Sequence, residues 1–440
     1  MITTLIGKTF LASFNEKYDK TYSAKDFFEQ IYFELFFNHS KYMQWITNSP
    51  FVQMKKGQKA NLLTSEERLE KLHALYDKAE NEIADASFAI GYPAADSKEF
   101  ASTSGMVSDI EIATEEDDIY YSWIGSGLGV GVAGGYNLLI NDPEILMTIY
   151  DGWKYYRDYL NDPLLDKMRG NQINSWNGQW LTYRLGNNYM PDFKISDLED
   201  EKVIKLTSNV IEINTVNWTN LFFSLSNLYP GKDLVTYVYS FGQTNKTIGF
   251  VPFYLKSGAR LKDVWRQLYG DPERFNNREF QSLFGLHIKR ACELGSVGLQ
   301  ALRPDKLKDH MKKSVGSLFK KESEYINYQT YKTWLVAMLS KNKQEITDYT
   351  KIIAELILRY RKGASGTERR NLINQRLFGE KSNKKIFLDA LTEMVNDVDG
   401  EDLYSLRELK NEIHLMTNEE FGYFNTLLKF DYAFIEKTNN

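Results

Sequence analysis

The chain has 440 residues, of which 42% are hydrophobic, and a formal net charge of −5. This length exceeds what one ordinary hydrophobic core serves, so we expect two or three domains. The single cysteine, Cys292, excludes an internal disulfide framework and a cysteine-based zinc cluster, and no two of the five histidines stand three or four residues apart as paired helix ligands. We therefore expect no metal site and no cofactor.

Two features of the sequence bear on the expected location of the protein. Lys8 interrupts the first apolar residues before a run typical of a signal peptide has formed. The longest uncharged stretch, near residues 120–146, contains a glycine cluster and the Asp142-Pro143 pair, which favour a buried segment of a folded domain over a membrane span. We expect a cytoplasmic protein without a membrane anchor.

The first part of the chain reads as helical. Ser23 and Thr64 are typical N-cap residues, and each is followed by an acidic first turn and by apolar residues at helical spacing. From residue 87 to 254 the pattern changes to short runs rich in β-branched and aromatic residues, at 87–92, 118–124, 203–213 and 234–241. One helix is predicted within this part, over 142–160, because Pro143 suits a first helical position.

Beyond about residue 285 the pattern becomes helical again, with predicted helices at 331–339, 347–360, 382–395 and 418–434. The sequence therefore predicts an α+β protein. A mixed N-terminal body with a sheet-bearing core covers residues 1–285, and a C-terminal helical bundle covers residues 286–440.

Charge is segregated along the predicted bundle. Residues 289–385 hold 22 Lys and Arg against 10 Asp and Glu, whereas residues 386–440 hold 4 against 12. A basic segment in an acidic protein favours contact with a polyanion, because phosphates bind Lys and Arg without any sequence motif. The alternative is a set of ordinary solvated helix faces. The candidate phosphate contacts are Lys312, Lys313, Arg361, Lys362, Arg369 and Arg370.

The run Gly125–Gly135 contains the spacing G-x-G-x-x-G at Gly129, Gly131 and Gly134. One interpretation is a dinucleotide site, although Pro143 follows too soon for the long helix that such a site requires. A second is a glycine-rich strand and turn packed closely against another backbone. A third is a loop whose amides approach a nucleic-acid backbone.

Two amide-rich segments carry further candidates. Asn174, Asn177 and Gln179 stand close to Trp176 and Trp180, and amide side chains of this kind can read base edges beside stacking rings. The alternative is a hairpin turn at Asn177-Gly178 with both tryptophans packed beneath it. The second segment contributes Gln243, Asn245 and Lys246, which can equally form a plain loop between two strands.

A weak nuclease pattern is also present. Asp192, Asp200 and Lys202 follow the order of a site in which two carboxylates hold Mg²⁺ and a lysine orients the attacking water. The alternative is a solvated acidic turn. Neither a phosphate-binding P-loop nor a serine-hydrolase elbow occurs in the sequence, so it predicts a binding protein more strongly than an enzyme.

The order of a mixed body with glycine- and aromatic-rich loops before a helical bundle resembles the large subunit of type I CRISPR Cascade surveillance complexes. The segments that carry this resemblance are Tyr239–Phe250 and the Gly125–Gly135 run. Some members of that family have paired C-x-x-C motifs, and the single cysteine excludes that subgroup.

The resemblance implies a non-catalytic subunit in antiviral defence with three kinds of partner: a DNA target, a CRISPR RNA and other subunits of the complex. The body would recognise a short motif beside the target, through Asn174, Asn177, Gln179, Gln243 and Asn245, and the bundle would hold the displaced strand. The alternatives are a Mg²⁺-dependent restriction-type endonuclease and a protein-only scaffold.

Overall fold

The computed structural model describes most of the chain in two compact units. The N-terminal unit comprises Met1–Lys256 and His287–Val297, and the C-terminal unit comprises Ser257–Leu286 and Gly298–Asn440. The described residues are 1–46, 49–85, 88–92, 114–186, 189–192, 203–207, 209–240, 246–270, 277–286, 288–304, 322–339, 346–364, 367–380, 382–416 and 418–438.

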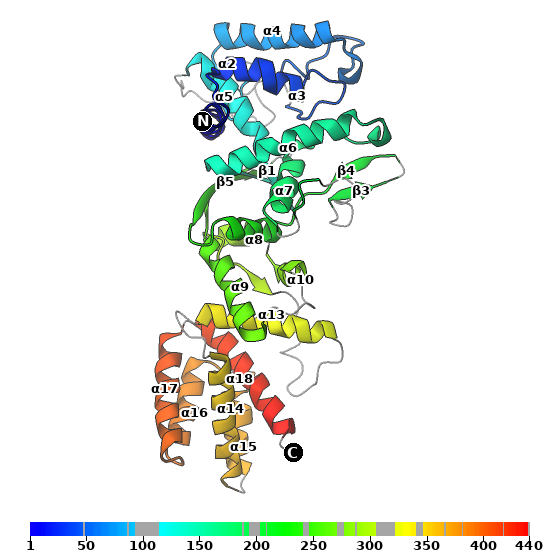
Figure 1. Cartoon of the computed structure of the whole chain (residues 1–440). Helices are drawn as coiled ribbons and strands as arrows, with labels where there is room; N and C mark the ends of the chain where they lie inside the picture. The colour runs from blue at the N-terminus through cyan, green and yellow to red at the C-terminus, as the bar shows by residue number, and fades with distance from the viewer. Residues whose placement is uncertain are drawn as a thin grey trace. The chain divides into compact units, whose positions relative to one another are not determined.

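The N-terminal unit combines helices with two small antiparallel sheets (Figure 1). Its helical elements are α1 (Ile2–Tyr18), α2 (Ala24–Phe27), η1 (Phe28–Phe33), α3 (Glu34–Phe36), η2 (Ala60–Leu62), α4 (Ser65–Asn81), α5 (Glu116–Gly127), α6 (Pro143–Asn161), η3 (Pro163–Leu165), α7 (Ile173–Arg184), α8 (Trp218–Leu228) and α11 (Ile288–Glu293). Its strands are β1 (Val130–Val132), β2 (Tyr136–Ile140), β3 (Ile204–Leu206), β4 (Ile211–Ile213), β5 (Leu234–Ser240) and β6 (Lys246–Phe253).

Local capping explains three helix starts that the sequence predicted. Ser23 accepts from the backbone N–H of Asp26, and Thr64 accepts from that of Glu67, so each begins a capping box. Asp142 caps α6 by accepting from the backbone N–H of Ile145, with Pro143 at the first helical position. These side chains satisfy N–H groups that have no partner inside the helix, which fixes where the helix begins.

The predicted strand at 118–124 is wrong, because these residues lie in α5. Glu115 caps this helix, and three acidic residues occupy its first turn, where they interact favourably with the helix dipole. The aromatic and β-branched residues that suggested a strand serve as core residues instead, since Tyr120, Trp123 and Ile124 are fully buried. The predicted run at 87–92 is also not a strand, because its described part, Phe88–Tyr92, forms turns.

Helices α1 and α5 cross with their backbones in close contact. A Cβ atom added at Gly7 would lie 2.0 Å from the carbonyl oxygen of Tyr121, and one added at Gly125 would lie 2.0 Å from that of Thr3. No side chain fits at either position. The crossing therefore requires glycine on both helices.

Aromatic side chains fill the core around this crossing. Tyr32 and Phe36 stack with their ring centroids 4.0 Å apart, and Phe37 stacks on Phe51 at the same distance. Trp153 of α6 meets Phe36 edge to face at 4.8 Å. Much of the aromatic content of the chain is thus used for packing.

The larger sheet has the strand order β1-β2-β5-β6, with every pair antiparallel. On one face Phe253 packs against Phe222 of α8, with ring centroids 6.1 Å apart. On the other face, α7 lies on β1, because a Cβ at Gly131 would come 3.0 Å from the backbone of Asn174. The strands predicted at 203–213 and 234–241 correspond to the β3–β4 hairpin and to β5.

The C-terminal unit is helical apart from one two-stranded pair, β7 (Phe284–Gly285) with β8 (Arg303–Pro304). Most of α9 (Leu255–Tyr269) belongs to it. Its core includes Ile357, Phe387, Leu409 and Leu428. Its other helical elements are α10 (Asn277–Ser282), α13 (Glu322–Leu339), α14 (Ile346–Lys362), α15 (Thr367–Asn371), η5 (Leu372–Leu377), α16 (Lys384–Val395), α17 (Glu401–Leu415) and α18 (Asn418–Thr438).

The α+β class predicted from the sequence is confirmed by these elements. Within the described ranges, no helix combines the length and the apolar character needed to cross a membrane. The domain boundary predicted at residue 285 stays a prediction. The second compact unit begins at Ser257, and the segment His287–Val297 belongs to the first unit.

Candidate nucleic-acid interface

The glycine run spans a helix end, a strand and a turn. Gly125 and Gly127 end α5, Gly131 lies in β1, and Gly134 and Gly135 form the turn into β2 with φ angles of 97° and 77°. A dinucleotide site needs the order strand, glycine loop, helix, whereas this run follows a helix and enters a strand. The dinucleotide interpretation is therefore wrong, and the close approach of Gly131 to α7 agrees with the interpretation as tight backbone packing.

The predicted hairpin turn at Asn177-Gly178 is also wrong, because both residues lie inside α7. Gly178 packs against β1, since a Cβ there would come 2.5 Å from the carbonyl oxygen of Gly131. The two tryptophans are buried, as that interpretation expected, with Trp176 at 0% and Trp180 at 2% exposure. Packing against the sheet thus stabilises a helix that the Asn-Gly pair alone would disfavour.

The amide side chains of α7 donate to main-chain carbonyls of the fold. Asn177 is fully buried, and its Nδ2 donates to the carbonyls of Gly127 at 2.8 Å and Gly129 at 2.9 Å. Asn174 also donates to Gly129, at 2.9 Å, and Gln179 donates to Asn214 at 2.7 Å. All three candidates therefore hold neighbouring backbone in place, and their contact with DNA stays a prediction.

A turn and the ends of two further strands lie at the same end of the larger sheet. Tyr136, the first residue of β2, pairs with Ser240, the last residue of β5, and Ser240 also pairs with Lys246. The exposed turn Ala133–Gly135 therefore lies at the same end of the sheet as Ser240 and Lys246, the described residues on either side of 241–245. Gln243 and Asn245 lie outside the described residues, and Lys246 is placed only by its backbone in β6.

A side-chain hydrogen bond also joins two of the strands that meet at this end. Asn137 Nδ2 donates to the hydroxyl of Tyr239 at 2.6 Å, across 102 residues of sequence. Burial raises the pKa of Tyr239, so this hydroxyl stays neutral. The bond thus joins the central strands β2 and β5 beside the end of the sheet where the glycine run ends and the Tyr239–Phe250 segment begins.

In the C-terminal bundle, two candidate arginines make ion pairs. Arg361 of α14 pairs with Glu436 of α18, and Arg369 of α15 pairs with Asp397 at 3.2 Å. The carboxylates come from the acidic segment 386–440, so folding brings together charges that are segregated along the chain. These two arginines carry less uncompensated charge than the sequence suggests.

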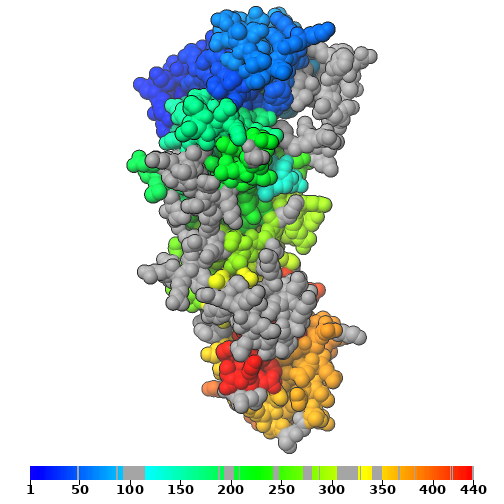
Figure 2. Space-filling model, turned by 90° about the vertical axis from the view of Figure 1, so that its right-hand side faces the viewer, coloured from blue at the N-terminus to red at the C-terminus, as the bar shows by residue number. Residues whose placement is uncertain are grey.

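Lys362 and Arg370 are exposed on the same bundle. Figure 2 shows that residues around 350–380, drawn in orange, form a large part of the visible surface of the C-terminal unit. Lys312 and Lys313 lie within residues 305–321, outside the described part of the chain. That segment holds six of the 22 basic residues counted between 289 and 385.

The nuclease pattern gains no support from the described residues. Asp192 is exposed, and Asp200 and Lys202 lie outside the described ranges. Among the residues whose placement is described, no group of three or more His, Cys, Asp or Glu side chains could hold a metal ion.

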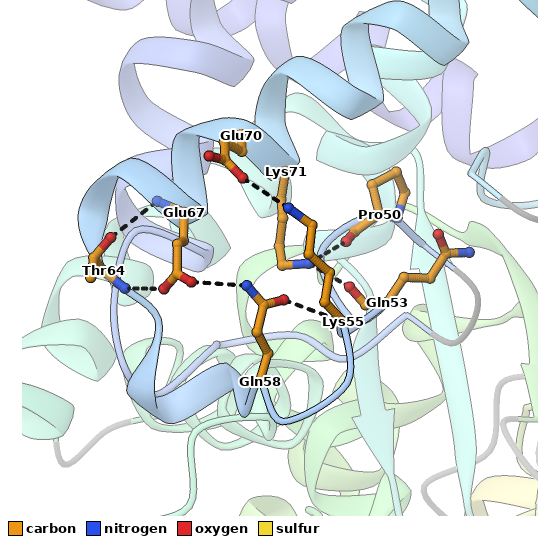
Figure 3. Close-up of polar contacts among 8 residues, drawn as sticks. All are labelled: Pro50, Gln53, Lys55, Gln58, Thr64, Glu67, Glu70 and Lys71. Atoms are coloured by element: carbon orange, nitrogen blue, oxygen red, sulfur yellow. Dashed lines mark hydrogen bonds and ion pairs between the residues drawn. The ribbon is translucent and has the colours of Figure 1, made fainter.

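A group of cations around His39, namely Lys41, Arg68 and Arg157, was missed in the sequence because these residues are far apart in the chain. Lys71 reaches from α4 to the main-chain carbonyls of Pro50 and Gln53, as Figure 3 shows. Arg157 of α6 is buried and donates to the carbonyls of Leu35 and Lys41. Main-chain carbonyl groups bind both cations. Because these groups carry no net charge, they do not neutralise the positive charge of Lys71 and Arg157.

The positive charge of Arg157 acts on His39. Burial, together with Arg157, lowers the pKa of His39 to about 4, and Arg68 and Lys41 contribute. Burial also lowers the pKa of Arg157 to about 10. Only the folded structure shows this group, since its cations come from α4, α6 and the segment after α3.

Comparison with known proteins gives no assignment: no protein-family model, curated protein or solved structure matches the chain.

Proposed function

We propose that the chain is the non-catalytic, nucleic-acid-binding large subunit of an RNA-guided surveillance complex, similar to the large subunit of type I CRISPR Cascade. In such a complex the guide RNA reads the target by base pairing, and the protein tests a short adjacent motif and the DNA shape. The proposal gives the chain three kinds of partner, which are a DNA target, a CRISPR RNA and other subunits. It places the protein in the cytoplasm.

One observation supports the proposal most. Two segments carry the family resemblance: Gly125–Gly135 contains β1 and leads into β2, and Tyr239–Phe250 begins in β5, which pairs with β2, so the Ala133–Gly135 turn, Ser240 and Lys246 lie at one end of the sheet. Exposed glycine amides in this turn suit a phosphate backbone, and Gln243 and Asn245, which follow Ser240 in the sequence, supply donors and acceptors for base edges. Motif recognition would take place at this end.

The bundle would hold the displaced strand by its phosphates. Because Arg361 and Arg369 are ion-paired, we assign most of this contact to Lys362, Arg370, Lys312 and Lys313. Phosphate contacts of this kind give affinity without sequence preference.

Isolation of the tagged chain from its native cells tests the proposal. We expect short RNAs that share a common 5′ segment, together with a fixed set of proteins, to co-purify with it. Recovery of the same proteins without RNA would instead support a scaffold, and recovery of the chain alone would overturn the proposal.

The endonuclease alternative needs a separate measurement. The purified chain is incubated with duplex DNA and Mg²⁺, beside the variants Asp192→Ala and Lys202→Ala. We expect no cleavage by any of the three. Cleavage that both substitutions abolish would replace the proposed function with that of a nuclease.

A further inference from the structure

The β5–β6 hairpin has an apolar face that is open to solvent. Val235 pairs with Pro252, and Tyr237 pairs with Phe250, so these four side chains lie on one face. Val235 is 55% exposed and Phe250 is 65% exposed. The outer face of a half-solvated antiparallel strand usually carries polar residues, so exposed apolar and aromatic groups here call for an explanation.

This face is open only over β5 and β6. Leu139 of β2 pairs with Tyr237 and lies on the same face, yet it is only 2% exposed. The face is covered over β1, where α7 packs against Gly131. The open half thus forms a shelf that begins at β5, beside the part of the sheet that α7 covers.

The rings on this shelf are held in fixed positions. Tyr237 and Phe250 meet edge to face, with ring centroids 5.3 Å apart. The hydroxyl of Tyr237 lies 3.4 Å from that of Thr247, and the hydroxyl of Tyr239 accepts from Asn137. A ligand would therefore meet a preformed aromatic surface, which lowers the entropy cost of binding.

The charge of this segment selects the class of ligand. From Leu234 to Lys256 the sequence contains two lysines, Lys246 and Lys256, and no Asp or Glu. Phosphates would meet no repulsion from carboxylates of the hairpin itself. Exposed aromatic rings on a sheet are a surface on which proteins stack unpaired bases.

We infer that the open face of the β5–β6 hairpin binds a single-stranded nucleic-acid segment by stacking bases on Phe250 and Tyr237. This inference rests on the proposed function and extends it, because it names unpaired nucleotides as the ligand of this part of the sheet. The RNA end and an unpaired DNA strand offer the same chemistry, and the experiment separates them.

The test uses the full-length purified chain with three labelled probes of one sequence: a 12-nucleotide RNA, the same sequence as single-stranded DNA, and the DNA duplex. The variants are Phe250→Leu, which keeps an apolar side chain but removes the ring, and Phe250→Trp, which keeps a stacking surface. Val235→Ala is the matched control, because Val235 is exposed on the same face but has no ring.

We expect Phe250→Leu to weaken single-strand binding by about 5-fold to 100-fold, the range for loss of one stacked base. Phe250→Trp should bind as tightly as the unmodified chain, Val235→Ala should stay within about twofold, and duplex binding should not change. Whichever single-stranded probe binds more tightly shows whether RNA or DNA is the ligand. Equal affinities for Phe250→Leu and the unmodified chain would overturn the inference, as would an equal loss on the duplex.

The experiments distinguish failure of the stacking inference from failure of the proposed function. If the chain co-purifies with RNA and protein partners but Phe250→Leu binds single strands normally, the inference falls and the proposed function stands. If the stacking effect is present but no RNA co-purifies, the proposed function falls and the inference stands. Loss of a partner protein from Phe250→Leu with normal single-strand binding would show a protein interface and overturn the inference.

Discussion

The side chain of Asn177 is joined to Gly129 by a hydrogen bond of 2.9 Å from its Nδ2 to the glycine carbonyl. Asn177 belongs to α7 and Gly129 to the segment between α5 and β1, 48 residues earlier. The sequence presents them as two separate candidate nucleic-acid motifs. In the fold they form one structural unit that holds the start of the sheet against a helix.

This relationship predicts that Asn177 acts on stability. Asn177→Ala removes a donor that serves two carbonyls at a fully buried position, and we expect it to cost about 2–4 kcal/mol of unfolding free energy. Gln179→Ala is the matched control, because Gln179 makes one such bond to Asn214 at a partly exposed position, and we expect a cost of about 1 kcal/mol. Urea unfolding measures both, and equal values would contradict the structural role of Asn177.

The crossing of α1 and α5 gives a second prediction. Gly7→Ala or Gly125→Ala places a methyl group against a main-chain carbonyl that cannot move aside, and we expect a loss of more than about 3 kcal/mol. Gly422→Ala in α18 is the control, because its Cβ would meet nothing within 4 Å. That change should stabilise the protein by about 0.5–1 kcal/mol, since alanine favours helix. Thermal unfolding separates the two results, and similar shifts would contradict the close crossing.

The parts of the fold that the sequence predicted are those with local signals. The starts of α2, α4 and α6 were predicted because the cap and its partner stand within three residues of each other. Helices α5 and α7 were not predicted, since contacts with α1 and β1 overcome the local preference of aromatic and Asn-Gly residues.

The candidate site depends on contacts between residues that lie even farther apart in the sequence. That the Ala133–Gly135 turn shares one end of the sheet with the end of β5 follows from the pairing of Tyr136 with Ser240, which no local pattern encodes. In the same way, the pairing of Arg361 with Glu436 spans 75 residues, so a count of charge along the chain could not show that the basic segment is partly neutralised. The role predicted for Lys312 and Lys313 stays a prediction, because they lie outside the described residues.

His39 predicts a dependence of stability on pH. Its pKa is about 4 in the folded chain and 6.5 ordinarily, so on acidification the unfolded chain takes up this proton first. Stability that is present above pH 6.5 is therefore lost as the pH falls toward 4. Because His39 is only partly buried, solvent screens the cations, and we expect a loss of only about 1 kcal/mol.

The comparison variant for this prediction is His39→Asn. Asparagine does not titrate, but it can still accept from the backbone N–H of Lys41, as His39 Nδ1 does at 3.0 Å. Unfolding is measured at about pH 7 and about pH 4.5 for both proteins, and the unmodified chain should lose about 1 kcal/mol more than the variant. The same pH dependence in both proteins would show that His39 is not held neutral by its surroundings.

The bundle allows a test that separates stabilising from binding arginines in adjacent positions. Arg369 pairs with Asp397, donates to the carbonyl of Tyr360 at 2.8 Å and lies 4.4 Å from the centre of that ring. We expect Arg369→Ala to lower the unfolding free energy by about 1–2 kcal/mol. Arg370 is exposed, and Arg370→Ala should change the unfolding free energy by no more than about 0.5 kcal/mol.

For DNA binding we expect the reverse order: Arg370→Ala should have the larger effect and Arg369→Ala the smaller one. If the bundle holds a strand by its phosphates, Arg370→Ala weakens single-stranded DNA binding and lowers the slope of log K against log salt by about 1, because one phosphate contact is lost. Arg369→Ala should leave that slope nearly unchanged below its unfolding temperature, since its charge is already paired with Asp397. A smaller slope for Arg369→Ala than for Arg370→Ala would mean that the ion pair opens to bind the strand. In that case the basic segment would act with its full charge, because the carboxylates brought to it by folding would be displaced by phosphate.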